Sequence, residues 1–350
     1  MPFFDADALK AWFVREKRAL PWRENPSPYA VWVSEIMLQQ TQASVVIPYF
    51  RRWMEKFPSI EAVANAPLEA LLKSWEGLGY YSRVRYLHEA AKSLLKDYGG
   101  ELPSEPEKLA TIKGIGPYTQ GAILSFAFHK KAAAVDGNVL RVMARYFSIE
   151  EEISSVKKKI QELTEQILPR EEPWVVMEGI IELGAQVCRK TPLCGECPLN
   201  KNCLAHLHRK SHLIPLKKKR ERTTLLQRAV AIVIYEKKLL IGRVKGKKVM
   251  ADLYEFPYVE ISAQKHALTQ IKKMIRNKLK VSSNFSSSLG PVDHTFTRYH
   301  ATLFPSIWRA EESVEVADYE WKTKEEIASL PFSSGHRQIL QSLTDAHFTH

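Results

Sequence analysis

The chain has 350 residues, 45% of them hydrophobic, so it can build more than one core and is not a disordered chain. Its net charge of +12 and pI near 9.4 favour a polyanionic partner, most simply a nucleic acid, although the same charge also serves solubility. No apolar run approaches the roughly 20 residues that span a bilayer, and the start MPFFDADALK is unlike a signal peptide. We therefore expect a cytoplasmic protein without membrane contact, or a nuclear or mitochondrial one in a eukaryote.

Residues 1–206 have the periodicity of helices and few β-branched runs. The pattern predicts helices over 5–19, 29–56, 67–75 and 82–97, with Pro48 breaking or kinking the second. We expect this part to form one all-α unit of about ten helices.

A glycine hairpin is expected within LATIKGIGPYTQGAILSFAFHKKAAAVDGN at residues 109–138. Ser104 and Glu107 have the spacing of a capping box, which starts a helix near Glu105. Gly114 and Gly116 are expected to allow positive φ and to leave backbone amides exposed before the next helix. Exposed amides at a helix start bind phosphate, so residues 105–129 predict either a DNA-binding hairpin or an ordinary αα-hairpin.

The four cysteines lie within the sixteen residues 188–203: Cys188, Cys194, Cys197 and Cys203. A cytoplasmic chain keeps its thiols reduced, so this grouping indicates a metal site rather than disulfides. A single C-x-x-C flanked by lone cysteines favours a [4Fe-4S] cluster, whereas zinc sites usually pair two such motifs. Zinc stays the alternative at this point.

Beyond the cysteines, residues 207–227 are rich in Lys and Arg and predict a basic interdomain linker. Residues 228–350 read as α+β. The segments AVAIVIY and KLLIGRV predict strands paired through Glu236 and Lys237, followed by a basic helix over 265–280 and strands near 289–309.

Five motifs together resemble those of a known family. They are LPWR at 20–23, VWVSEIMLQQTQ at 31–42, GLGYYSR at 77–83, GIGPYT at 114–119 and VDGN at 135–138. With the cysteine loop, they resemble the endonuclease III superfamily of DNA glycosylases, and within it the MutY-type adenine DNA glycosylases. The resemblance implies an all-α helix-hairpin-helix glycosylase domain with an iron–sulfur loop, followed by an α+β, Nudix-like (MutT-like) domain that recognises 8-oxoguanine.

The resemblance also implies an activity and a partner. The activity is base-excision repair: hydrolysis of the N-glycosidic bond of adenine mispaired with 8-oxoguanine or guanine. The partner is the double-stranded DNA that carries the mispair, and we expect a monomer.

Four residues are expected to carry the chemistry. Glu35 lies in an apolar run, where desolvation raises a carboxyl pKa, and the resemblance makes it the acid that protonates adenine, at N7. Asp136 precedes a helix expected over 137–147; by itself it is an ordinary N-cap, and by resemblance it is the ionised carboxylate beside the sugar. Tyr118 stands where bifunctional relatives carry a Schiff-base lysine, so we expect a monofunctional enzyme that leaves an abasic site. Asn138 would help to position the sugar or Asp136.

Further contacts with DNA are implied only by the resemblance. Gln40, Thr41 and Tyr80 would probe the duplex near the extruded base. Trp22, Arg23 and Glu178 would line the adenine pocket, with Glu178 accepting from the exocyclic amine. The loop that reads 8-oxoguanine would carry Phe296, Thr297 and Arg298.

The sequence departs from the family pattern in three places. The first cysteine gap has five residues where the family has six. The helix ALTQIKKMIRNKLK is basic where a Nudix hydrolase needs acidic metal ligands, so we expect no pyrophosphohydrolase activity. Thr297 and Arg298 stand where the family carries Ser and His.

Three other functions stay open from the sequence. An endonuclease III-like glycosylase/AP lyase would cut the strand as well as the glycosidic bond. A non-catalytic iron–sulfur DNA-binding module would need neither Glu35 nor Asp136. A nucleotide hydrolase in residues 228–350 would need Mg²⁺.

Overall fold

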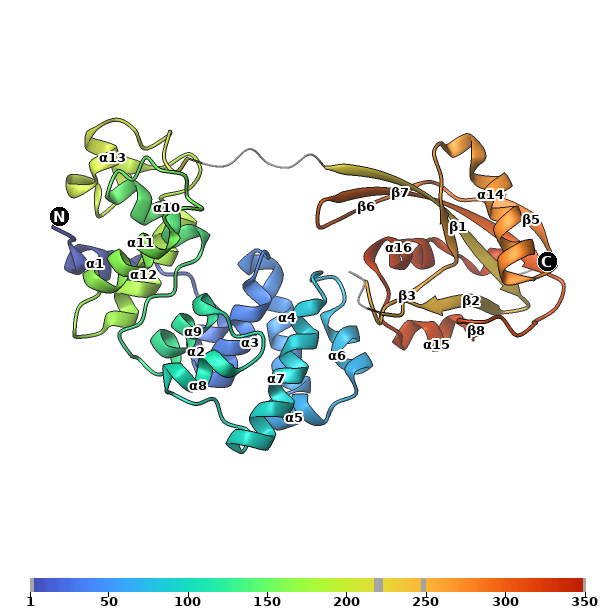
Figure 1. The fold of residues 1–350 in the computed structure, drawn as a ribbon, viewed down its shortest axis with the longest axis horizontal. Coiled ribbons are helices and arrows are strands. Elements are labelled where there is room, and N and C mark those ends of the chain that lie inside the picture. The colour runs from blue at the N-terminus through green and yellow to red at the C-terminus, as the bar shows by residue number, and fades with distance from the viewer. Residues whose placement is uncertain (1–2, 217–222, 247–249, 349–350) are drawn as a thin grey trace. The chain divides into compact units, whose positions relative to one another are not determined.

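The structure is a computed structural model that describes residues 3–216, 223–246 and 250–348 (Figure 1). Its contacts divide the chain into two compact units. The helical unit comprises Met1–Asn65 and Tyr86–Arg220, and the sheet unit comprises Ala66–Arg85 and Glu221–His350. Within the described ranges, no helix combines the length and the apolar character needed to cross a membrane.

The helical unit is built almost entirely of helices. They are α1 (Ala6–Glu16), α2 (Pro21–Glu24), α3 (Pro28–Leu38), α4 (Ala43–Lys56), α5 (Ile60–Asn65), α8 (Pro106–Thr111), α9 (Pro117–Ala122), a π-helix (Ile123–Ala127), α10 (Gly137–Tyr146), α11 (Lys157–Ile167), α12 (Pro173–Gln186) and α13 (Leu204–Leu207). Helix α7 (Ser82–Tyr98) begins in the sheet unit, which also contains α6 (Leu68–Trp75).

Helix α3 is the most buried element near the site. The Ser27 hydroxyl accepts from the Ala30 amide and Pro28 occupies the first turn, so the helix has a defined start. Nine of its eleven residues are buried, including Glu35. The predicted 29–56 helix is divided at residues 39–42, whereas Pro48 lies inside α4, so a break at Pro48 is not what the structure shows.

The glycine hairpin is present between α8 and α9, with two corrections. Gly114 has φ +89, as expected, but Gly116 has φ −86 in extended backbone and does not need positive φ. Helix α8 starts beside Glu105 as expected, but Glu105 and not Ser104 is its N-cap, since Pro106 occupies the first turn, and no side chain caps it. The Ser104 carbonyl and hydroxyl accept from the Lys130 ammonium. The capping-box expectation is therefore wrong.

The sheet unit contains a mixed sheet. Its described strands are β1 (Thr224–Tyr235), β2 (Lys238–Arg243), β3 (Tyr254–Glu255), β4 (Tyr258–Glu260), β5 (Ser283–Ser288), β6 (Val292–Phe296), β7 (Tyr299–Ala310) and β8 (Tyr319–Thr323). The order is β3-β2-β1-β7-β5, with β4 paired to β1, β6 to β7 and β8 to β2. The predicted β1–β2 hairpin is confirmed, with Tyr235 opposite Lys238 and Glu236 in left-handed backbone.

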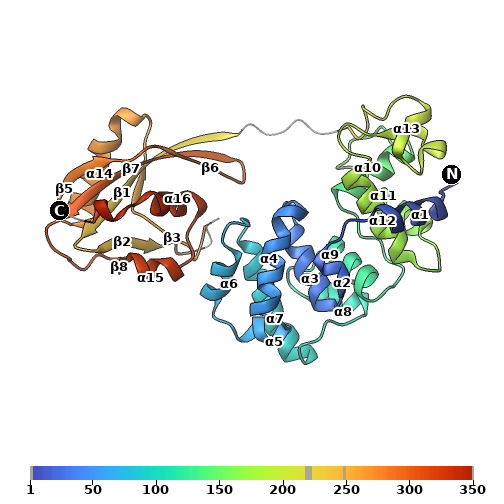
Figure 2. The same ribbon diagram turned by 180° about the vertical axis from the view of Figure 1, so that it is seen from behind.

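Helices cover both faces of this sheet (Figures 1 and 2). Even-numbered residues of β1 such as Val230 and Ile232 pack with α15 (Lys324–Ser329) and α16 (Ser334–Ser342). Odd-numbered residues such as Ala231 pack with α14 (Ala267–Met274) and the π-helix Ile275–Leu279. The predicted basic helix is thus present as α14 and its π-helical continuation.

Two expectations about this region change in detail. Strand β5 starts at Ser283, before the strands expected near 289–309, because its serine-rich sequence lacks a strand-like apolar alternation. Part of the proposed linker 207–227, residues 217–222, lies outside the described residues, and β1 already begins at Thr224.

Candidate active site

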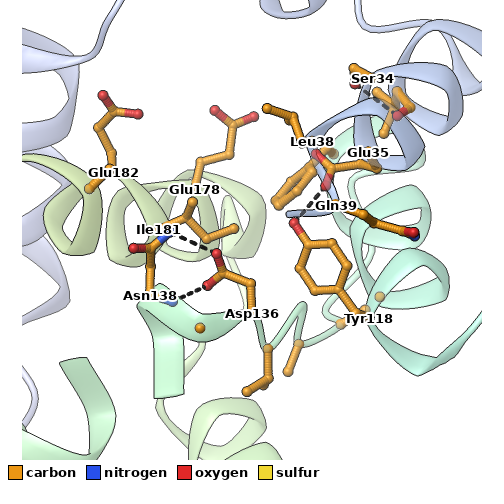
Figure 3. Close-up of a pocket in the computed structure, with 18 of the residues that line it drawn as sticks. Ser34, Glu35, Leu38, Gln39, Tyr118, Asp136, Asn138, Glu178, Ile181 and Glu182 are labelled. Atoms are coloured by element: carbon orange, nitrogen blue, oxygen red, sulfur yellow. Dashed lines mark hydrogen bonds between the residues drawn. The ribbon is translucent and has the colours of Figure 1, made fainter. Parts of the chain in front are cut away.

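The helical unit contains a pocket of about 1530 Å³ (Figure 3). Residues from α2, α3, α9, α10 and α12 line it, together with the segment before α10. It brings together nine of the residues singled out in the sequence: Trp22, Arg23, Glu35, Gln40, Thr41, Tyr118, Asp136, Asn138 and Glu178.

The environment of Glu35 favours the protonated form of its carboxyl group. Its residue is 5% exposed, and burial raises its pKa from 4.5 to about 7. The Tyr118 hydroxyl donates to Glu35 Oε2 at 2.5 Å, which opposes the rise, while the charges of Asp136 and Glu178 add to it. A carboxyl group with a pKa near neutrality can deliver a proton under physiological conditions.

Asp136 has a different environment from Glu35 and is partly rather than fully buried. One carboxylate oxygen accepts from the Asn138 and Val139 amides, each at 2.8 Å, so it is the N-cap of α10. The other accepts from the Asn138 side-chain amide at 2.7 Å (Figure 3). Burial raises the pKa of Asp136 above its ordinary value, and these three hydrogen bonds oppose that rise. All three contacts donate to the carboxylate, which favours its ionised form.

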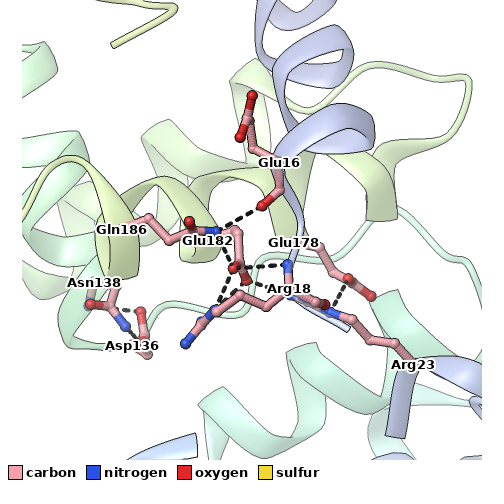
Figure 4. Close-up of polar contacts among 8 residues, drawn as sticks. All are labelled: Glu16, Arg18, Arg23, Asp136, Asn138, Glu178, Glu182 and Gln186. Carbon is pink, nitrogen blue, oxygen red and sulfur yellow. Dashed lines mark hydrogen bonds and ion pairs between the residues drawn. The ribbon is translucent and has the colours of Figure 1, made fainter. Parts of the chain in front are cut away.

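One wall of the pocket carries a network of charges around Glu182 (Figure 4). Glu182 is fully buried and accepts from Arg18 Nε at 2.5 Å, Arg23 Nη2 at 3.0 Å and Gln186 Nε2 at 2.5 Å. Burial acts to raise the pKa of Glu182, but the Arg18 hydrogen bond and the two arginine charges outweigh it and hold the pKa below its ordinary value. Arg23 Nε also pairs with Glu178 at 2.9 Å.

The sequence reasoning missed Arg18, Glu182 and Gln186. Glu178, Glu182 and Gln186 recur every four residues along α12, so they share one helix face. That spacing was the available signal, but their arginine partners come from more than 150 residues earlier in the chain.

The remaining predicted residues of the helical unit lie around this centre. Trp22 is buried against Phe50 in an edge-to-face contact at 5.5 Å, so it serves the core as well as the pocket wall. Gln40 lies in left-handed backbone in the turn after α3, and Thr41 donates to the Gln39 carbonyl. Gly114 lies against Tyr86, where an added Cβ would come within 2.9 Å of the Tyr86 Cβ.

The sheet unit holds the other predicted DNA contacts. Tyr80 is 41% exposed with φ +47, in a turn where Gly77 and Gly79 also have positive φ. The Arg83 guanidinium donates to the Leu78 and Gly79 carbonyls, each at 3.1 Å, and so holds that turn. Phe296, Thr297 and Arg298 lie at the tip of the β6–β7 hairpin.

The four cysteines lie in one loop after α12, and each is partly buried. Burial raises the pKa of Cys197 to about 12, and repulsion from the other three sulfurs adds to the rise. Arg145 is almost fully buried and donates to Cys188 Sγ at 3.2 Å and to the Arg189 carbonyl at 2.6 Å. No three His, Cys, Asp or Glu side chains in the described parts of the chain are spaced to enclose a single metal ion.

Arg141 joins this loop to the pocket. Its Nε donates to the Cys188 carbonyl at 2.7 Å, and its Nη2 donates to Asn138 Oδ1 at 2.8 Å. Since Asn138 in turn donates to Asp136, one chain of hydrogen bonds links the cysteine loop to the site carboxylate.

Comparisons with known proteins agree with this geometry. Residues 33–170 match the HhH-GPD superfamily of base excision DNA repair proteins, and residues 229–342 match the NUDIX domain. The chain is 33% identical over 310 residues to an adenine DNA glycosylase of Buchnera aphidicola subsp. Baizongia pistaciae, covering 88% of this chain and 86% of that protein.

Two further matches cover the first part of the chain. An adenine DNA glycosylase of Rattus norvegicus is 42% identical over 210 residues, 57% of this chain, but the match spans only 41% of the rat protein. The structure of a thermostable thymine-DNA glycosylase superposes with a TM-score of 0.54 at 28% identity, covering 58% of this chain and 95% of that one. The extent and identity of the Buchnera match, on top of the two domain matches, place this chain in the adenine DNA glycosylase family.

Proposed function

We propose that this protein hydrolyses the N-glycosidic bond of adenine mispaired with 8-oxoguanine or guanine in double-stranded DNA. The observation that carries the proposal is a pair of carboxyl groups in one pocket, of which Glu35 is buried and Asp136 partly buried. Glu35 has a pKa of about 7, whereas Asp136 accepts three hydrogen bonds. Two carboxyl groups with opposed environments are the means by which glycosidic bonds are cleaved.

The reaction requires the adenosine nucleotide to leave the base stack and enter the pocket. Glu35 donates its proton to N7 of adenine, and the electrons of the C1′–N9 bond leave with the base. The sugar becomes an oxocarbenium ion, which the Asp136 carboxylate stabilises at short range. Water then adds its hydroxyl to C1′, and its proton passes to a carboxylate of the site, so the products are adenine and an abasic site.

Recognition of adenine is assigned to the pocket wall. Glu178 would accept from the exocyclic amine, because its ion pair with Arg23 Nε at 2.9 Å favours the carboxylate form against the rise in pKa that burial causes. Arg23 and Trp22 would contact the adenine base. Gln40, Thr41 and Tyr80 would enter the duplex near the gap that the extruded adenine leaves. Gly114 and Gly116 would present backbone amides to phosphate.

We propose a monofunctional enzyme. Tyr118 occupies the hairpin position at which a lyase needs an amine, and its hydroxyl is engaged with Glu35. Lys113 is the nearest lysine in sequence, but it pairs with Glu89 at 2.6 Å and is absent from the lining of the pocket.

The cysteine loop is proposed to hold a [4Fe-4S] cluster. The donor chemistry fits, because four thiols lie in one sixteen-residue loop and the Arg145 guanidinium, whose charge favours thiolate, donates to Cys188 Sγ. When bound, the cluster would tie the 188–203 loop together. The chain's own contribution is the Arg141–Asn138 link, which orients Asp136.

The two family matches support a separate function for each part of the chain. We propose a glycosylase domain at 1–206, a basic linker at 207–227 and a domain at 228–350 that reads 8-oxoguanine through Phe296, Thr297 and Arg298. We further propose that the chain acts as a monomer on duplex DNA and that, in a bacterium, it works at the nucleoid.

The test is single-turnover release of adenine from a duplex carrying adenine opposite 8-oxoguanine. Wild type should release adenine and leave an intact strand until alkali is added. Strand nicking without alkali would instead support a glycosylase/lyase, and tight binding without release would support a DNA-binding module. Iron and sulfide analysis of the same preparation should find four of each per chain, and zinc would overturn the cluster.

A further inference from the structure

The tip of the β6–β7 hairpin is held in a costly backbone conformation. Phe296 and Tyr299 are the last paired residues, so Thr297 and Arg298 form the loop. Thr297 has φ +48, which is rare for a β-branched residue. Such a conformation persists only where the surroundings enforce it, and it is often found at functional sites.

A stack of rings and one guanidinium lies directly behind this tip. The Arg228 guanidinium lies 4.6 Å from the Tyr258 ring centroid and 5.6 Å from that of Phe296. The ring of Phe296 also stacks on His294 at 5.0 Å. Arg228 in β1 shares a sheet face with Tyr258 of β4 and Phe296 of β6, because residues two apart along a strand point the same way.

The guanidinium is held mainly by rings. Its side chain is 16% exposed, Nη2 pairs with Glu260 at 3.0 Å, and Nε has no hydrogen-bond partner among the described residues. Two histidines, His294 and His336, face the guanidinium, and both are neutral. Burial lowers the pKa of His336 to about 3, and burial together with the Arg228 charge lowers the pKa of His294. Arg228 is therefore the one charged member of this stack.

The stack is also anchored to the rest of the unit. The His336 ring nitrogen accepts from the Phe256 amide at 3.0 Å, and Gly335 brings α16 so close that an added Cβ would lie 3.1 Å from His294. On the other side of the tip, the Thr224 amide donates to the Arg298 carbonyl at 2.9 Å. The hairpin tip is thus fixed from β1, β4 and α16.

We infer that Arg228 is a positioning residue for discrimination between 8-oxoguanine and guanine. By clamping Phe296 against Tyr258, it holds Thr297 and Arg298 in the geometry that meets the base opposite adenine. This inference rests on the proposed function. It assigns Arg228 no part in cleavage, because the cleavage pocket is lined by residues of the helical unit.

The experiment compares Arg228→Met with wild type in single-turnover adenine release opposite 8-oxoguanine and opposite guanine. The ratio of the two rate constants should fall about tenfold, the size expected from the loss of two cation–π contacts. The rate opposite guanine should stay unchanged, whereas a general folding defect would lower both rates together. Arg228→Lys should restore part of the ratio, since it keeps a cation between the rings.

Two further variants make the outcome decisive. Tyr258→Leu removes one ring while keeping Arg228, and it should lower the same ratio even if Arg228→Met fails to fold. Arg276→Met, at an exposed position after α14, is the matched control and should leave the ratio intact. A wild-type ratio in folded Arg228→Met and Tyr258→Leu, or an equal loss of both rates, overturns the inference alone. No adenine release by wild type removes the proposed function and this inference with it.

Discussion

At the scale of single residues, Glu35 should control the pH dependence. It acts as an acid only while protonated, and its pKa is about 7, so the single-turnover rate should fall as pH rises through about 7. The Tyr118 hydrogen bond lowers that pKa, so Tyr118→Phe should move the falling limb to higher pH. Glu35→Gln should lower the rate about 10²–10⁴-fold and should also abolish the fall in rate with rising pH. A limb that stays in place in Glu35→Gln would assign it to another group.

Asp136 combines two roles that one substitution can separate. Asn is as good an N-cap as Asp, so Asp136→Asn should keep α10 capped and change the free energy of unfolding by less than about 1 kcal/mol. The uncharged amide cannot stabilise a sugar cation, so adenine release should be lost. Thermal melts and single-turnover assays on the same sample check both parts. Full activity in the folded variant would reduce Asp136 to a helix cap.

At the scale of elements, close backbone contact should decide the stability of the hairpin. An added Cβ at Gly121 in α9 would lie 2.1 Å from the Ala133 carbonyl oxygen, whereas nothing lies within 4 Å of one at Gly116. Gly121→Ala should therefore cost about 1–3 kcal/mol or more of unfolding free energy. Gly116→Ala is the matched control and should be nearly neutral, because its φ of −86 suits alanine. Chemical denaturation measures both, and equal losses would refute the packing argument.

At the scale of the whole molecule, the NUDIX-like part should not be a second enzyme. Residues 261–292 contain no Asp or Glu, and α14 carries lysines where a hydrolase would bind Mg²⁺ through carboxylates. We expect no turnover of 8-oxo-dGTP by the full chain with Mg²⁺, while the same preparation still releases adenine from DNA. Phosphate or pyrophosphate release above a no-enzyme control would show that the sheet unit kept hydrolase chemistry.

The sequence alone determined the parts of this protein that depend on neighbours along the chain. Each of these parts is encoded by a few adjacent residues. They are Asp136 at the start of α10, the GIGPYT turn, the clustered cysteines and the β1–β2 hairpin. An error arose at α8, where the helix starts one residue later than a capping box on Ser104 requires, with Pro106 in its first turn.

Only the tertiary structure decided how the site is tuned. Tyr118 lies 83 positions from the Glu35 carboxyl to which it donates, and Arg18 lies 164 positions from Glu182. The clamp of Arg228 between Tyr258 and Phe296 likewise joins three separate strands. Desolvation and charge coupling depend on distances through space. A shifted pKa or a clamped side chain therefore arises only after folding has brought such residues together.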